Sequence, residues 1–307
     1  MSEHPWDADR ELTVAQATSA IQSQFPEVAA NVVQPIGSGW DNDAFVVDDR
    51  WIFRFPRCRD VADQLDKERR LAPIVAQALS DLGIAVPAMS MPGQPCDDFP
   101  YRFTGYPRLP GIPADQLPEG QIDTTAVADA LGAALARLHS ISADSLTHVG
   151  LPTDSSGPAH SLAEVRESAD LLRALDGPDV QRCLEWVMDS SVLPPPYAGE
   201  LRFVHSDIAT EHIFVDPETG RLVGLLDFGD AVFGDPAIDF ASLPSQLGWE
   251  ATEAALGTYS IPIDRGFLDR LEFMSRANPL TWLHYAHLQG GDVEKHRRWV
   301  LNAFGSG

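Results

Sequence analysis

The chain has few cysteines, no long apolar run and no secretory start. Its three cysteines, Cys58, Cys96 and Cys183, are far apart and lack the spacing of a metal site, which is typical of a reducing compartment. No segment approaches the roughly 18 consecutive apolar residues that a membrane helix needs. Residues 1–7 have neither the basic start nor the apolar stretch of a secretory signal. We therefore expect a cytoplasmic protein with no membrane partner.

Basic residues are also scarce. The chain has 22 Lys and Arg against 45 Asp and Glu, and its formal net charge is −23. Such a protein repels the phosphate backbone of nucleic acids, so we expect no nucleic-acid partner, and it attracts cationic small molecules. High acidity is equally a general solubility trait, so the charge by itself leaves the cationic ligand open.

The length and the apolar content favour two lobes. A chain of 307 residues exceeds what one hydrophobic core usually serves, and a hydrophobic content of 44% is enough for two cores. Proline and glycine cluster at residues 106–113, which predicts a connector there. The expected division is an N-terminal lobe of residues 1–105, a hinge of residues 106–113 and a C-terminal lobe of residues 114–307.

Apolar periodicity predicts the main elements of each lobe. Residues 11–25 have helical spacing, and a five-stranded sheet is expected after them. Residues 101–111 are expected to form an edge strand that continues into the connector. In the C-terminal lobe, residues 124–139 predict a long buried helix, and residues 161–189 predict one or two helices.

Two aspartates follow apolar strands in the C-terminal half. The apolar residues 201–204 precede Asp207, and the apolar residues 222–226 precede Asp227. Residues 216–220, Asp-Pro-Glu-Thr-Gly, form a strong turn signal because proline presets φ and glycine permits a positive φ. We therefore expect both carboxylates at the same end of a short antiparallel ribbon. An isolated turn aspartate is usually only solvated, but this pair suggests a functional site.

Such a pair fits phosphoryl transfer. Moving a γ-phosphoryl group to a hydroxyl needs a carboxylate at the proton of the acceptor and ligands for magnesium, with little covalent chemistry from the protein. Asp207 and Asp227 can divide these two roles.

The same segments carry a family resemblance. His205-Ser-Asp207 with His212, followed by Asp227-Phe-Gly229, resembles the catalytic and metal-binding motifs of antibiotic phosphotransferases, the aminoglycoside and macrolide kinases. The resemblance extends from about residue 35 to about residue 247. It implies an α+β, two-lobed protein-kinase-like fold with a small N-lobe containing an antiparallel sheet and a larger, mainly helical C-lobe. The implied donor is ATP or GTP, and the implied cofactor is Mg²⁺.

The resemblance also implies roles for the residues of these motifs. Asp207 is the implied catalytic carboxylate, and Asp227 and His212 are the implied magnesium ligands. His212 stands where many relatives have Asn, and a His there is similar to the aminoglycoside 2″ and macrolide 2′ branch. Magnesium prefers oxygen ligands, so Asp227 is the firmer ligand of the two. His205 is expected to bond the backbone, and Asp239 is implied to support the catalytic loop.

In the N-terminal lobe, the resemblance implies a nucleotide site. Gly37, Ser38 and Gly39 join two predicted strands, residues 32–36 and 44–47, in a hairpin that could lie over phosphates, although two glycines alone are a weak signal.

Two charged residues complete the implied phosphate site. Arg54 stands where kinases have a lysine that binds phosphates, and Glu68 is its implied partner. Arginine keeps the charge and can contact phosphate with two N–H groups.

The hinge is the implied site of the purine base. Pro107 has no N–H, so the backbone donors expected for the base are those of Arg108 and Leu109.

The expected substrate is a small-molecule antibiotic, first an aminoglycoside, and the expected protein is a monomer. The alternatives are a macrolide 2′-phosphotransferase, then a metabolic kinase acting on homoserine, choline or methylthioribose. A further alternative is a pseudokinase that binds ligands without turnover, which the Arg54 and His212 substitutions suggest.

Overall fold

The computed structural model describes residues 9–38, 41–118, 122–154 and 157–305. The chain forms two compact units. The first consists of Met1–Pro110, His148–Gly150 and Gly224–Gly229, and the second of Gly111–Thr147, Leu151–Val223 and Asp230–Gly307. The lobe limits expected from the sequence stay a prediction. Within the described residues, no helix combines the length and the apolar character that crossing a membrane requires.

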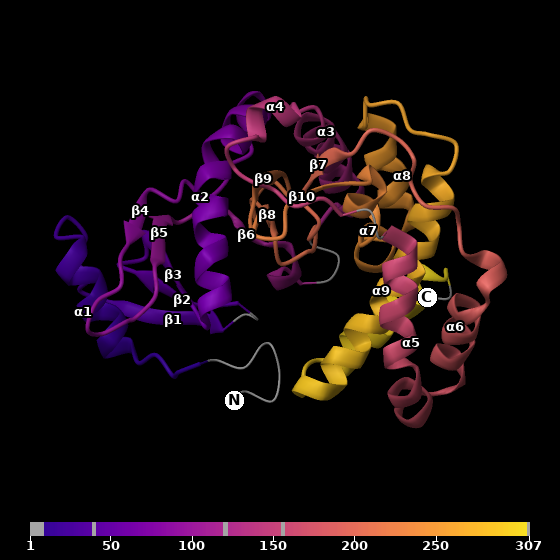
Figure 1. Cartoon of the computed structure of the whole chain (residues 1–307), viewed down its shortest axis with the longest axis horizontal. Helices are drawn as coiled ribbons and strands as arrows, with labels where there is room; N and C mark the ends of the chain where they lie inside the picture. Colours follow the sequence, from indigo (N-terminus) through magenta and orange to yellow (C-terminus); the bar gives the residue numbers. More distant parts are fainter. Residues whose placement is uncertain (1–8, 39–40, 119–121, 155–156, 306–307) are drawn as a thin grey trace. The chain divides into compact units, whose positions relative to one another are not determined.

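The first unit is built on one five-stranded antiparallel sheet, as expected (Figure 1). The strand order is β1-β2-β3-β5-β4. The strands are β1 (Val33–Ser38), β2 (Asn42–Val47), β3 (Trp51–Pro56), β4 (Met91–Gly93) and β5 (Phe103–Pro107).

One expectation about this sheet is wrong. β5 pairs with β3 on one side and with β4 on the other, so it is not an edge strand. The edge is β4, which has only three residues, among them Pro92 and Gly93. Both residue types disfavour strands, so the sequence pattern did not reveal β4.

Alternate residues of the strands point to opposite faces of the sheet, and each face packs against one helix. The helix α1 (Val14–Gln24) covers a face rich in phenylalanine, where Phe55 and Phe103 stack with ring centroids 4.6 Å apart. The helix α2 (Arg59–Leu79) covers the other face, where Ile52, Ala72 and Tyr106 pack together. Figure 1 shows the two helices flanking the sheet.

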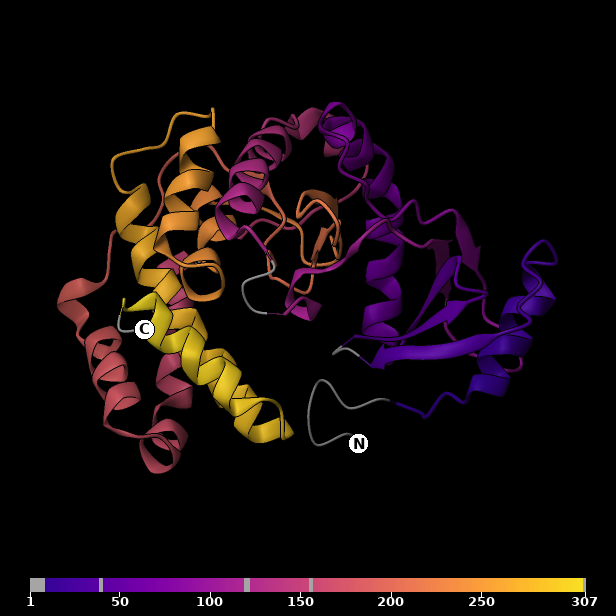
Figure 2. The same ribbon diagram turned by 180° about the vertical axis from the view of Figure 1, so that it is seen from behind.

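The second unit is mainly helical. Its expected long helix is α3 (Thr124–His139), and the expected helical region 161–189 is divided into two helices, α5 and α6. The remaining bounds are α4 (Ala143–Leu146), α5 (Gly157–Leu175), α6 (Pro178–Met188), α7 (Leu243–Gln246), α8 (Trp249–Thr258), α9 (Phe267–Gln289) and α10 (Val293–Ala303). α3 packs on α8 and α5 packs along α9 (Figures 1 and 2). The mixed α and β architecture expected from the sequence is thus confirmed.

Short strands in the C-terminal half carry the predicted motifs. β7 (Arg202–Val204) pairs with β10 (Val232–Gly234), and β8 (Ile213–Val215) lies between β6 (Ile112–Pro113) and β9 (Leu222–Leu225).

The predicted turn joins β8 to β9. The N–H of Gly220 donates to the carbonyl of Asp216 at 2.8 Å, and Gly220 has a φ of 67°. The turn signal was therefore correct, because this position needs the left-handed conformation that glycine adopts readily.

Candidate functional site

A buried guanidinium group joins two carboxylates in the first unit. β3 supplies Arg54, which is 7% exposed, and α2 supplies Glu68, which is 3% exposed. Nη1 of Arg54 donates to the two carboxylate oxygens of Glu68 at 3.0 and 3.1 Å. Its Nη2 donates to both carboxylate oxygens of Asp227 at 3.4 Å. The expected pairing of Arg54 with Glu68 is present, and Asp227 is joined to it.

Burial and the neighbouring charges shift the pKa of Arg54 and of Glu68. Burial alone would lower the pKa of Arg54, but the negative charges of Asp227 and Glu68 raise it, so the guanidinium stays charged. Burial raises the pKa of Glu68 to about 6; the attraction of Arg54 opposes this shift and the repulsion of Asp227 adds to it. The site therefore holds one permanent cation and a carboxylate that can titrate slightly below neutral pH.

Asp227 lies just after β9 in a left-handed conformation, with a φ of 65°. Such a conformation costs roughly 1–3 kcal/mol in a residue other than glycine and is common at functional sites. The carboxylate also accepts the N–H of Gly229 at 3.4 Å, and 32% of the side chain is exposed. The backbone thus presents a carboxylate with access to solvent next to a fixed cation.

Asp207 lies in the second unit, in the loop between β7 and β8. The residue before it, Ser206, has a φ of 72°. The side chain of Asp239 accepts the N–H groups of His205 at 2.8 Å and of Ser206 at 2.7 Å. The N–H of Asp207 donates to Nδ1 of His205 at 3.2 Å, while 42% of the Asp207 side chain is exposed. His205 and Asp239 thus make the backbone contacts expected of them.

His212 contacts the same aspartate. Its Nδ1 is 2.9 Å from the carbonyl oxygen of Asp207 and 3.3 Å from its carboxylate. A carbonyl oxygen can only accept a hydrogen bond, so Nδ1 carries the proton. In the neutral ring, Nε2 then has the lone pair that a metal ion requires.

The donor chemistry at Asp227 fits magnesium. Within the described residues, no group of three or more His, Cys, Asp or Glu side chains could hold a metal ion. Magnesium at a nucleotide site usually keeps several waters and binds one or two carboxylates together with phosphate oxygens. A partly exposed carboxylate therefore suffices, and a single imidazole nitrogen at His212 is the weaker donor.

The predicted nucleotide residues are placed as follows. β1 includes Gly37 and ends at Ser38, with an irregular register between Pro35 and Gly37. Gly39 lies outside the described residues. A Cβ at Gly37 would meet no other atom within 4 Å, so packing does not require a glycine there.

The two hinge residues differ in their backbone contacts. The N–H of Arg108 donates to the carbonyl of Arg50 at 2.8 Å, which extends the pairing of β3 with β5. An N–H group bonded in this way is not available to a base. Of the two expected backbone donors, only that of Leu109 stays a prediction.

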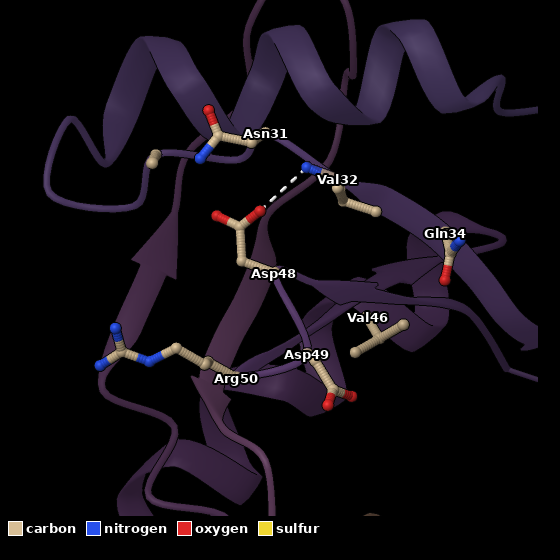
Figure 3. Close-up of a pocket in the computed structure, with 8 residues that line it drawn as sticks. Asn31, Val32, Gln34, Val46, Asp48, Asp49 and Arg50 are labelled. Carbon is tan, nitrogen blue, oxygen red and sulfur yellow. Dashed lines mark hydrogen bonds between the residues drawn. The ribbon is translucent and has the colours of Figure 1, made fainter.

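A hollow of about 580 Å³ lies elsewhere on the first unit (Figure 3). The N–H of Val32 donates to the Asp48 carboxylate at 2.9 Å beside it. None of the predicted site residues lines it. Its lining residues are Ala29, Asn31, Val32, Gln34, Val46, Asp48, Asp49 and Arg50.

Two buried residues next to the predicted ones were missed by sequence reasoning. Tyr106 of β5 hydrogen-bonds Arg54, and burial raises the pKa of its hydroxyl. His139, at the end of α3, contacts Asp239 with its Nε2 at 2.9 Å. Neither lies in a motif, and their partners are distant in the chain, so no local signal was available.

Known proteins show clear similarity to the chain. Residues 32–269 match the model of the phosphotransferase enzyme family, APH. The uncharacterized protein YcbJ of Bacillus subtilis strain 168 is 27% identical over 279 residues, which cover 83% of this chain and 82% of that protein.

Two solved structures share the fold. The GDP and kanamycin complex of APH(2″)-IIIa has a TM-score of 0.70 and 21% identity, covering 94% of this chain and 96% of that one. The macrolide 2′-phosphotransferase MphH of Brachybacterium faecium, an apoenzyme, has a TM-score of 0.61 and 22% identity, covering 94% and 98%. The expected two-lobed, kinase-like fold class is therefore confirmed.

Proposed function

The chain belongs to the phosphotransferase enzyme family, and on that premise we propose that it transfers the γ-phosphate of ATP or GTP to a hydroxyl of an antibiotic, first an aminoglycoside. The observation that carries this proposal is the buried Arg54, which bridges Glu68 and Asp227. A fixed cation beside a partly exposed carboxylate suits the binding of a nucleoside triphosphate with its metal ion. Support for a nucleotide donor comes from the GDP complex of a structural relative.

Each residue has a role in this proposal. Asp207 orients the acceptor hydroxyl and accepts its proton late in the transfer. Arg54, ordered by Glu68, contacts the phosphates that are not transferred. Asp227, with His212 as a weaker ligand, holds Mg²⁺, which neutralises charge on the phosphates when it is bound.

The nucleotide contacts are proposed from the first unit. The backbone of the hairpin at Gly37 and Ser38 lies over the phosphates, and the N–H of Leu109 donates to the base. That Asp207 and Asp227 act on one nucleotide complex stays a prediction.

Two observations favour an aminoglycoside over other acceptors. The net charge of −23 attracts a polycation. A structural relative was solved with kanamycin bound. A macrolide is the second candidate, because another relative of similar coverage is a macrolide 2′-phosphotransferase.

A substrate panel tests the proposal. Kanamycin-type aminoglycosides, hygromycin and erythromycin-type macrolides are each incubated with ATP or GTP and Mg²⁺, and phosphorylated product is measured by mass spectrometry. We expect an aminoglycoside to gain one phosphate group. Product from a macrolide alone would support the second candidate. Nucleotide binding without transfer to any acceptor and without hydrolysis would favour the pseudokinase and contradict the proposed function.

A further inference from the structure

His139 lies behind the loop that presents Asp207. It ends α3, and its Nε2 is 2.9 Å from Oδ2 of Asp239. Its Nδ1 is 2.7 Å from the hydroxyl of Tyr259. The side chains of His139 and Asp239 are both 0% exposed. This histidine therefore forms a side-chain contact to Asp239 inside the core of the second unit.

The charge state of Asp239 determines the direction of the hydrogen bond that it shares with His139. Burial alone would raise the pKa of Asp239, but the hydrogen bonds from His139 and the backbone lower it, so the group is a carboxylate. A carboxylate only accepts, so Nε2 of His139 donates to it. When the ring is uncharged, Nδ1 has the lone pair that accepts a hydrogen bond from the Tyr259 hydroxyl, 2.7 Å away.

The carboxylate of Asp239 accepts hydrogen bonds from the backbone of the loop that carries Asp207. Oδ2 accepts from His205 N and from His139, while Oδ1 accepts from Ser206 N. Ser206 has a φ of 72°, a conformation that persists in a serine only when its surroundings hold it. The next residue is Asp207, so the Asp239 carboxylate holds the backbone immediately before Asp207.

We propose that His139 is a positioning residue for phosphoryl transfer, because it fixes Asp239 and thereby the left-handed turn at Ser206 that presents Asp207. The inference rests on the proposed role of Asp207 and adds a residue outside the catalytic motif. Without His139, the buried Asp239 keeps two backbone donors and loses its third. A buried carboxylate that lacks one of its hydrogen-bond donors rotates or binds a water molecule instead. The loop that is bonded to the carboxylate then moves too.

The chain contains a matched control. Nε2 of His287 is 2.9 Å from Oδ2 of Asp176, and the Asp176 side chain is also 0% exposed. The other partner of that carboxylate is the guanidinium of Arg297, with Nη2 at 2.8 Å. Replacing His287 therefore breaks the same kind of buried histidine–aspartate bond without affecting the loop of Asp207.

The experiment compares His139→Leu, His139→Gln and His287→Leu, with Asp207→Ala as reference. We measure kcat and both KM values, with kcat expressed per nucleotide-binding site so that a misfolded fraction does not count. We expect His139→Leu to lower kcat by about 100-fold, the effect of roughly 1 Å of misplacement, with KM values changed less than about twofold. His287→Leu should keep kcat within about twofold of the original protein, although it lowers the melting temperature.

The variant His139→Gln shows whether kcat depends on the hydrogen bond to Asp239 or on the packing of the imidazole ring. The amide of His139→Gln can donate to Asp239 and accept from Tyr259, so we expect kcat within about fivefold of the original value. If His139→Leu does not fold, His139→Asn replaces it, because its shorter amide does not reach Asp239, and the same loss of kcat is expected.

Two outcomes separate this inference from the proposed function. If Asp207→Ala abolishes transfer while His139→Leu keeps kcat within about twofold, the positioning inference is overturned and the proposed function stands. If the original protein transfers phosphate to no acceptor, amide hydrogen exchange at His205 and Ser206 decides the inference. Exchange at least about tenfold faster in His139→Leu, but unchanged in His287→Leu, supports it, and equal exchange in both overturns it.

Discussion

Glu68 and Asp227 share one cation, and this arrangement makes the charge of Glu68 depend on pH. The pKa of Glu68 is about 6 in the folded protein against 4.5 for the free side chain. As the pH falls through 6, Glu68 becomes neutral and Arg54 keeps only Asp227 as a charged partner. The guanidinium then loses the contact that, in the proposed mechanism, orients it toward the phosphates.

We therefore predict that KM for the nucleotide rises as the pH is lowered through about 6. Protonation of Glu68 does not itself unfold the protein, because a raised pKa means that the folded state binds this proton more tightly. The resulting stabilisation is present below 4.5 and is lost as the pH rises through about 6. Steady-state kinetics from pH 5 to 8 check this. In Glu68→Gln, KM should be higher and nearly independent of pH; a pH profile like that of the original protein would exclude Glu68 as its source.

Asp207 allows a second prediction at the scale of the residue. We expect Asp207→Ala to lower kcat by roughly 10²–10⁴-fold, because the acceptor loses its proton acceptor and its orientation. The backbone contacts of the loop to Asp239 do not involve this side chain. The melting temperature should therefore stay within a few degrees. Unchanged kcat in a folded variant would remove Asp207 from the mechanism.

At the scale of the element, the contact of α3 with α8 depends on a glycine. A Cβ at Gly132 would lie 1.9 Å from the carbonyl oxygen of Ala255 and 2.5 Å from the hydroxyl of Thr258. A backbone atom cannot give way as a flexible side chain can. The absence of a side chain at Gly132 therefore sets the distance between the two helices.

We predict that Gly132→Ala destabilises the protein by about 3 kcal/mol or more, because the helices must separate. Gly257, in α8, is the matched control, since a Cβ there would meet no atom within 4 Å. Gly257→Ala should instead stabilise the protein by about 0.5–1 kcal/mol, the usual gain of alanine over glycine inside a helix. Denaturant titration measures both variants. Equal effects at the two positions would contradict the close helix contact.

At the scale of the whole molecule, the net charge of −23 should increase the rate at which a cationic acceptor binds. Long-range attraction to a polycation is screened beyond roughly 10 Å at 0.1 M salt. We predict that kcat/KM for a kanamycin-type substrate falls about tenfold between 20 and 200 mM KCl. For an erythromycin-type substrate, which carries one charge, the expected fall is less than about twofold.

Sucrose at matched osmolality is the control for solvent effects. An equal salt dependence for both acceptors would show that the acidity of the chain serves solubility alone.

Local patterns predicted much of the fold because helix spacing, strand length and turn residues act over a few neighbours. The helix at residues 124–139 and the turn at residues 216–220 are examples. β4 was missed because its three residues are held by pairing with β5 rather than by their own preference. Its presence also corrects the position of β5 in the sheet.

The residues of the proposed catalytic motif were specified by the sequence alone, since Asp207, His212 and Asp227 are close to one another along the chain. Tertiary structure decided which groups support them. Asp239 meets His139 across 100 positions of sequence, and Arg54 meets Asp227 across 173. Such contacts exist only when distant segments are packed together, because burial and hydrogen bonding act through space. Packing therefore decided the partners of each charge, whereas the order of residues had already specified which charges were present.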